Sequence, residues 1–164
     1  MAAFNESFHQ PGDVIYVGKP FMRVIKKELW GKICANCLRR TSELKFCKGC
    51  GILKYCGKIC QKTDWCYHKF ECPLLKCYSD DRWPTITFLM GNIIMKMQKT
   101  NWKSVSEKIH NEIVSFDSLR TFKGEPSTNI SFKIYVENIK NSLNAYIGKK
   151  NVPDDKLVKS LLGK

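Results

Sequence analysis

The sequence predicts a small α+β fold held together by bound metal, and three observations point to it. Eight of the nine cysteines lie between Cys34 and Cys72, with a histidine among them. A run rich in β-branched and aromatic residues, Asp13 to Ile25, precedes this cluster. After Cys77, apolar residues recur at helical spacing almost to the end of the chain. The 164 residues suit one domain, or a small module with a helical extension.

The run from Asp13 to Ile25 predicts two short strands joined by a turn. Its sequence, DVIYVGKPFMRVI, contains the breakers Gly18 and Pro20 and follows Pro11-Gly12. Two strands alone cannot bury an apolar face. We therefore expect the cysteine-rich segment or the later helices to cover this strand pair.

The cysteines are expected to be reduced and to bind metal. Their number is odd, and the first residues lack the basic and apolar regions of a secretory signal, so a disulfide scaffold is disfavoured. The longest apolar stretch, residues 86–97, is broken by Gly91, Asn92 and Lys96 and is too short to span a bilayer. The sequence predicts a soluble intracellular protein, in the nucleus, the cytoplasm or both, without a membrane partner.

Eight candidate metal ligands follow a regular spacing. In chain order they form C-x2-C, C-x2-C, C-x3-C and H-x3-C pairs: Cys34 with Cys37, Cys47 with Cys50, Cys56 with Cys60, and His68 with Cys72. A C-x2-C pair on a tight turn points both sulfurs at one ion, and a spacing of four places two ligands on one helix face. Eight such ligands make two closed tetrahedral zinc sites. Cys66 and Cys77 fall outside the pattern and are expected to be bystander thiols.

The run LKFCKGCGILKYCGKICQKTDWCYHKFEC, residues 44–72, resembles the MYND finger, above all in its pattern YC-x3-CQ-x2-DW-x2-HK-x-EC. A RING finger has its histidine at the fourth ligand position and a PHD finger at the fifth, whereas this chain has it at the seventh. The HIT-type finger is the closest competitor in ligand order. Gln61, Asp64-Trp65 and His68-Lys69 favour MYND.

The resemblance implies an interleaved arrangement of the ligands, which the spacing alone does not reveal. One zinc ion would be held by Cys34, Cys37, Cys56 and Cys60. The other would be held by Cys47, Cys50, His68 and Cys72.

The resemblance also implies protein partners, because MYND fingers are docking modules and several bind short proline-rich peptides. At the positions of Gln61 and Trp65, the family's Gln and Trp help to form the peptide groove. Four residues apart on a helix, an amide can hydrogen-bond to a peptide backbone beside an indole face that packs on proline. The alternative is that Trp65 seals the core of the finger, and an exposed Trp65 would favour docking.

The segment PGDVIYVGKPFMRVIKKEL directly before the finger is similar to the start of the SET-and-MYND lysine methyltransferases. In that family a Gly-x-Gly turn that helps to bind S-adenosylmethionine precedes the first strands, and an Asn-His-Ser-Cys element and a catalytic tyrosine follow the helical insert. This chain has no Gly-x-Gly before Pro11, and neither His9 nor His110 lies in such an element. We therefore expect no catalytic residues and no enzymatic activity from this chain alone.

Three functions follow as alternatives. The first is a protein-interaction module, a catalytically vacant relative of the SET-and-MYND family. The second is a fragment or short isoform of an S-adenosylmethionine-dependent methyltransferase. The chain itself is expected to comprise three segments: residues 1–33, a short strand segment resembling the start of a SET domain, residues 34–72, the finger, and residues 73–164, a helical segment.

The third alternative is nucleic-acid binding, which the distribution of charge raises. The formal net charge is +13, and residues 19–77 hold 14 basic against four acidic residues. This basic segment is either a solvated face or a surface that attracts acidic partners, including nucleic acid. Aromatic residues among the cations can serve as a stacking surface; the candidates are Lys45, Lys48, Lys54, Lys58, Lys62 and Lys69 with Phe46, Tyr55 and Trp65.

Apolar spacing predicts three helices after Cys77, and a fourth near the C-terminus. The three stripes are Ile86, Leu89, Ile93 and Met97; then Trp102, Val105, Ile109 and Ile113; then Phe132, Tyr135, Ile139, Leu143 and Tyr146. Residues 123–129 read as a loop. The last helix is predicted to begin near Pro153, with Asp154 and Asp155 in its first turn and Gly163 as its C-cap.

Overall fold

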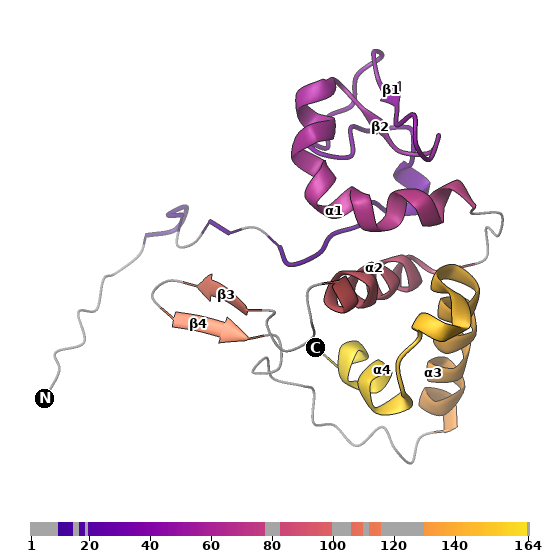
Figure 1. Ribbon diagram of the computed structural model, residues 1–164. Coiled ribbons are helices and arrows are strands. Elements are labelled where there is room, and N and C mark those ends of the chain that lie inside the picture. The colour runs from indigo at the N-terminus through magenta and orange to yellow at the C-terminus, as the bar shows by residue number, and fades with distance from the viewer. Residues whose placement is uncertain are drawn as a thin grey trace, which may run out of the picture.

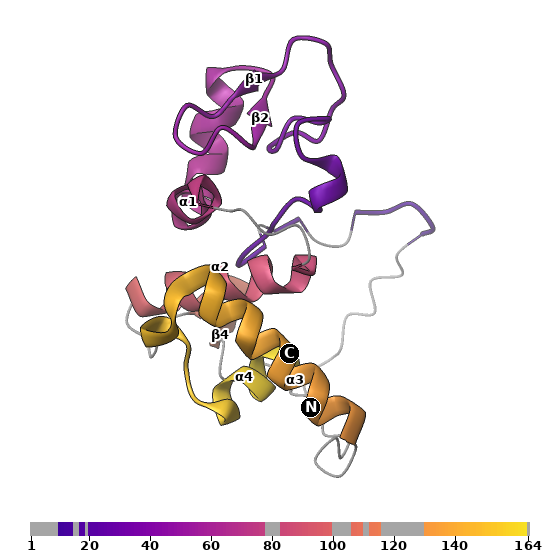
Figure 2. The same ribbon diagram turned by 90° about the vertical axis from the view of Figure 1, so that its right-hand side faces the viewer.

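A computed structural model of the protein describes residues 10–14, 17–18, 20–77, 83–99, 106–109, 112–115 and 130–163. The cysteine-rich finger forms one tier and the helices that follow it form another, and the two tiers meet where α1 packs on α2 (Figures 1 and 2). Four α-helices account for most of the regular structure: α1 (Lys58–Lys76), α2 (Thr85–Lys99), α3 (Ile130–Leu143) and α4 (Asp155–Leu162). This architecture confirms the small α+β class with a mostly helical C-terminal segment.

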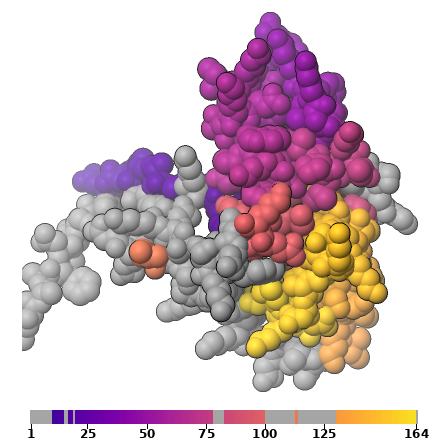
Figure 3. Space-filling view, in the orientation of Figure 1, coloured from indigo at the N-terminus to yellow at the C-terminus, as the bar shows by residue number. Residues whose placement is uncertain are grey.

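The finger is built from a short hairpin and the first helix. Strands β1 (Lys45–Phe46) and β2 (Lys54–Tyr55) pair antiparallel, with Lys45 opposite Tyr55. A short 3-10 helix, η1 (Lys27–Leu29), comes before them in the chain. With so little regular structure, the finger needs other interactions to hold its shape. Figure 3 shows it as a lobe that stands on the helical part, by which we mean residues 83–99 and 130–163.

Helix α1 turns one face inward from Asp64 onward. Most of its buried residues recur at intervals of three and four, as expected for one helical stripe, and only Phe70 lies off that stripe; the buried residues are Asp64, His68, Phe70, Glu71, Cys72 and Leu75. Four of these six, Asp64, His68, Glu71 and Cys72, are charged or titratable side chains. The interior face of α1 therefore carries chemistry as well as packing.

Helix α2 packs against α1 on one side and against α3 and the π-helical turn η3 (Asn144–Gly148) on the other. The predicted stripe residues Ile86, Leu89 and Ile93 are only half-buried, while Phe88 and Ile94 are almost fully buried. A helix with neighbours on two sides buries more than one narrow stripe, which explains this difference.

An aromatic cluster joins the two tiers. The ring of Phe88 meets Trp30 edge-on, with centroids 5.3 Å apart, and meets Tyr146 at 5.0 Å. Gly91, one turn further along α2, allows this approach, because an added Cβ would lie only 2.6 Å from the Tyr146 ring. Glycine is thus required where α2 and η3 touch.

The C-terminal helices agree with their sequence signals. Helix α3 spans most of the third predicted stripe, and Ile139, Leu143 and Tyr146 are buried. A 3-10 turn, η4 (Lys149–Asn151), leads towards α4, whose N-cap Asp154 accepts a hydrogen bond from the Leu157 amide at 2.9 Å. Gly163 caps its C-terminus, as predicted.

The strand pair predicted over Asp13–Ile25 is wrong for the residues that the structure describes there. Residues 13–14, 17–18 and 20–25 lie in no strand, and residues 15, 16 and 19 are outside the described part. Two backbone carbonyl groups of this segment accept hydrogen bonds from helix side chains and not from a neighbouring strand. The carbonyl of Pro20 accepts from the Tyr67 hydroxyl at 2.8 Å, and that of Phe21 accepts from Lys96 Nζ at 2.6 Å. Helix side chains thus take the acceptors that a neighbouring strand would use.

The second predicted helix is also wrong, since a hairpin occupies this region. Strands β3 (Ser106–Ile109) and β4 (Glu112–Ser115) pair antiparallel, with Ile109 opposite Glu112. A spacing of four residues, as between Ile109 and Ile113, fits a helix face and also an alternating strand, so the stripe was ambiguous. Trp102, Val105 and the predicted loop at residues 123–129 lie outside the described residues.

In the part of the chain that the structure describes, none of the helices is long and apolar enough to cross a membrane.

Candidate metal centre

Two clusters of Cys and His side chains lie inside the finger. In each cluster the four candidate ligand atoms lie within 4.8 Å of one another; the first comprises Cys34, Cys37, Cys56 and Cys60, and the second Cys47, Cys50, His68 and Cys72. Each cluster combines one C-x2-C pair with one pair from α1 or the turn that leads into it. The structure thus brings together the interleaved sets that the family resemblance implies.

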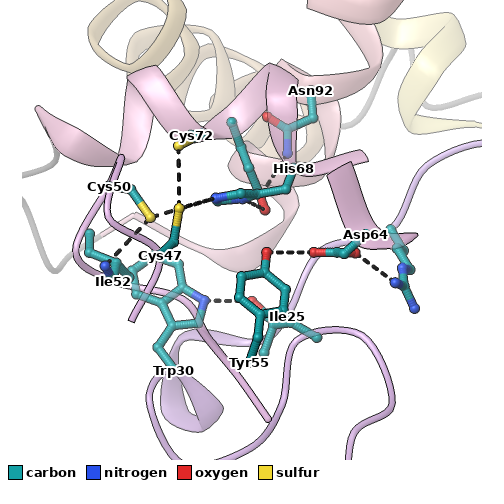
Figure 4. Close-up of polar contacts among 12 residues, drawn as sticks. Ile25, Trp30, Cys47, Cys50, Ile52, Tyr55, Asp64, His68, Cys72 and Asn92 are labelled. Carbon is teal, nitrogen blue, oxygen red and sulfur yellow. Dashed lines mark hydrogen bonds and ion pairs between the residues drawn. The ribbon is translucent and has the colours of Figure 1, made fainter. Parts of the chain in front are cut away.

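The distances within the clusters suit tetrahedral sites. In the first, the Sγ atom of Cys56 lies 3.8 Å from that of Cys37 and 3.4 Å from that of Cys60. In the second, Cys47 Sγ lies 3.8 Å from Cys72 Sγ and 3.3 Å from His68 Nε2 (Figure 4). Two sulfur ligands of one tetrahedral zinc ion, each about 2.3 Å from the metal, are separated from each other by nearly the sulfur–sulfur distances found in these clusters.

Both C-x2-C pairs lie on the same kind of turn. In each, the residue after the second cysteine has a left-handed backbone and donates its amide to the first cysteine's carbonyl. Leu38 has φ +62° and Gly51 has φ +71°, and both of these hydrogen bonds are close to 2.9 Å. Glycine adopts this conformation freely, whereas leucine pays about 1 kcal/mol for it. The repeated turn points both sulfurs of a pair inward.

Helix α1 supplies three of the remaining ligands, Cys60, His68 and Cys72, and Cys56 lies in the turn that leads into it. His68 and Cys72 are four residues apart and therefore lie one above the other on its buried face. Gly49, between the two cysteines of the second C-x2-C pair, makes room for them. A Cβ at this position would lie 2.7 Å from Cys72 Sγ. The second site is thus too closely packed for any side chain there.

The thiols of the first site need a cation to ionise together. A hydrogen bond to Arg39 lowers the pKa of Cys37 to about 6. In contrast, hydrogen bonds to the thiols of Cys60, Cys34 and Cys37 raise the pKa of Cys56 to about 12. A divalent ion favours the thiolate at every ligand. Four sulfur donors, or three with one imidazole, are the donor sets of structural zinc sites, so the residues fit zinc.

The imidazole of His68 is oriented by a carboxylate. Its Nδ1 atom lies 3.0 Å from Glu71 Oε1, while Nε2 faces the sulfurs of Cys47 and Cys50. Both side chains are buried. Donation from Nδ1 leaves the Nε2 lone pair for a metal, as in other carboxylate–histidine–zinc arrangements.

Gln61 and Trp65, the predicted peptide-binding pair, lie on α1 outside both clusters. Trp65 is 47% exposed, and its ring and that of His68 form a T-shaped pair with centroids 5.9 Å apart. Gln61 is half-buried, and no described residue hydrogen-bonds to its side-chain amide. The bystander thiols Cys66 and Cys77 are exposed and belong to neither cluster.

Asp64, predicted only as part of the sequence signature, ties the N-terminal segment to the finger. Its carboxylate accepts from Arg23 Nη2 at 2.6 Å and from the Tyr55 hydroxyl at 2.7 Å. Arg23 also donates to the Asn36 side chain and lies over the Tyr67 ring. Burial and the Asp64 carboxylate raise the pKa of Tyr55 far above its ordinary value, so the phenol remains a donor.

Sequence reasoning missed the residues behind the second site. Glu71 was recoverable, because it lies three positions after His68 on the same helix and so on the same face. Asn92, which donates to Glu71 from α2, carried only the weak signal of a polar residue inside an apolar stretch.

Two interleaved Cys/His sites, built on a hairpin and a helix, define the class of cross-braced two-zinc fingers. Within this class, residues 34–72 match the MYND finger. The chain therefore contains a MYND finger, which binds two zinc ions, and both of these predictions are confirmed.

The similarity to known proteins extends beyond the finger. Histone-lysine N-methyltransferase SMYD3 of Mus musculus is 33% identical over 101 residues, which are 62% of this chain and 23% of that protein. Histone-lysine N-methyltransferase ASHR1 of Arabidopsis thaliana is 34% identical over 104 residues, 61% of this chain and 21% of that protein.

A third relative, SET domain-containing protein 14 of Caenorhabditis elegans, is 43% identical over 47 residues, 29% of this chain and 11% of that protein. The chain spans about a quarter or less of the length of the curated relatives it matches. The resemblance to SET-and-MYND methyltransferases is confirmed over about 60% of this chain.

Proposed function

We propose that this protein is a zinc-dependent docking module whose finger binds proline-rich segments of protein partners. The observation that carries the proposal is the exposure of Trp65, which is 47% accessible on α1. A tryptophan that served only to seal the small finger would be buried. Aromatic side chains of this kind are the usual contact for proline rings.

The surroundings of Trp65 support this role. Its ring packs on His68, a residue of the second cluster, so the indole is held in place before a ligand arrives. Gln61 lies one turn earlier on α1 and offers an amide that no described residue engages. Together they offer an aromatic face and an amide.

The test is a fluorescence-polarisation titration of the zinc-loaded chain with labelled proline-rich decapeptides, decaproline included. Trp65→Ala and Gln61→Ala are each expected to weaken binding about tenfold, the value of one lost interface anchor. Tyr135→Ala is the matched control, because Tyr135 is 44% exposed on α3 and far from this surface in sequence. Unchanged affinity in both finger variants, or equal loss in the control, would refute the docking surface.

A second candidate, a part of a lysine methyltransferase, is supported by the similarity that extends well beyond residues 34–72. It makes a different prediction from docking. Isothermal titration of the 164-residue chain with S-adenosylmethionine is expected to show no binding if docking alone is its function. A stoichiometric isotherm would favour the methyltransferase candidate instead.

A further inference from the structure

A buried chain of hydrogen bonds runs from the second zinc site into the helical part. His68 Nδ1 lies 3.0 Å from Glu71 Oε1, and Glu71 Oε2 accepts from Asn92 Nδ2 at 2.9 Å. The Oδ1 atom of Asn92 accepts in turn from the Tyr146 hydroxyl at 3.2 Å. All four residues are at least 94% buried. Figure 4 shows Asn92 reaching from α2 toward the His68 ring.

In this hydrogen-bond network, the donor and the acceptor of every hydrogen bond are fixed. Burial and the Glu71 carboxylate raise the pKa of Tyr146 well above its ordinary value, so its phenol stays protonated and donates. Asn92 then accepts with its oxygen and donates with its nitrogen, and the Glu71 carboxylate accepts at both oxygens. The remaining donor must be Nδ1–H of His68, which leaves Nε2 free to bind metal. This one placement of the protons gives each of the four side chains a hydrogen-bond partner.

The packing around this hydrogen-bond network leaves room for its hydrogen bonds to form. Gly91 precedes Asn92 on α2, and an added Cβ there would lie 2.6 and 2.8 Å from two atoms of the Tyr146 ring. Without glycine at this position the phenol could not approach α2 closely enough to reach Asn92. The Glu71 charge, buried in the finger, also requires donors, and Asn92 supplies one from outside the finger.

We propose that Asn92 and Tyr146 are positioning residues of the second zinc site. They hold the Glu71 carboxylate, and through it the His68 imidazole, in the orientation that binds zinc. The helical part therefore contributes to the metal affinity of the finger, and bound zinc stabilises the helical part by the same amount. This inference rests on zinc binding by the finger and is independent of the docking surface.

The experiment uses cobalt(II) as a spectroscopic probe in the full 164-residue chain. A site with four sulfurs and a site with three sulfurs and one imidazole absorb at different visible wavelengths, so each site can be followed separately. Competition with zinc then gives the zinc affinity of each site. Asn92→Leu is expected to weaken the second site about tenfold, as loss of an outer partner of a ligand does, and to leave the first site unchanged.

A milder variant and a packing control complete the design. Tyr146→Phe keeps the ring and removes only the last hydrogen bond, so about a threefold loss is expected at the second site. Ile94→Val shortens a fully buried side chain of α2 that has no polar contact. It is expected to lower stability without changing either metal affinity.

The proposal is overturned if both Asn92→Leu and Tyr146→Phe bind cobalt at the second site as tightly as the unaltered protein. It is equally overturned if the two sites weaken together, or if Ile94→Val weakens the second site as much, since either result indicates general destabilisation. Should Asn92→Leu fail to fold, the result for Tyr146→Phe decides.

Discussion

Removal of zinc by a strong chelator is expected to unfold residues 34–72. The strands of the finger are only two residues long, and the cysteines of both clusters are part of its core. Structural zinc sites contribute about 10 kcal/mol or more to folding, which exceeds what so small a core can supply. Circular dichroism with added chelator, followed by return of zinc, measures the loss and its reversal.

The number of zinc ions bound per chain in the purified protein is a second measurement of the same zinc dependence. Two zinc ions per chain are expected, and Cys66→Ser and Cys77→Ser should both retain them, because these exposed thiols lie outside the clusters. A content of one ion or none, or a finger that keeps its structure in excess chelator, would contradict the prediction.

Asp64→Ala is expected to destabilise the zinc-loaded protein by about 3 kcal/mol, the cost of removing one partner of a buried ion pair. The carboxylate is 6% exposed and bonds to Arg23 and Tyr55 together. Its loss leaves the Tyr55 phenol without its acceptor and leaves the Arg23 guanidinium, whose side chain is 71% buried in the intact protein, without its counter-charge. Urea denaturation measures the change.

Two comparisons test the mechanism of this loss. Thr63→Ala, at the neighbouring exposed position of α1, should change stability by less than about 0.5 kcal/mol. The double variant Arg23→Ala/Asp64→Ala should lose less than the sum of the single variants, because the second change removes a group already unpaired. Additive losses would show that Arg23 and Asp64 do not stabilise the fold as a pair.

The features predicted best from the sequence depend on residues close together in the chain. Asp154 and Gly163 define the ends of α4 by local capping, and the apolar stripe of α3 needs only its own periodicity. The ligand pairs were likewise visible in their spacing. The interleaving of the pairs came from the family resemblance, because nothing local says which turn meets which helical pair.

The features that the sequence did not predict depend on distant partners. Gly91, Asn92 and Lys96 interrupt an apolar stretch and were interpreted only as breaks in it. In the structure each has a specific contact: Gly91 admits the Tyr146 ring, Asn92 bonds to Glu71, and Lys96 donates to the carbonyl of Phe21. These partners lie 20 or more residues away, beyond the reach of any periodicity. The same holds for the N-terminal segment, whose backbone is engaged by α1 and α2.

The interleaved ligands have a consequence for how the finger can be divided. The first site closes the chain from Cys34 to Cys60, and the second from Cys47 to Cys72, so the two metal-closed loops overlap. A cut between Cys47 and Cys60 opens both loops at once and restores chain entropy to each. Unlike tandem fingers that each fold around one ion, this segment cannot be halved, and its smallest autonomous piece must contain every ligand.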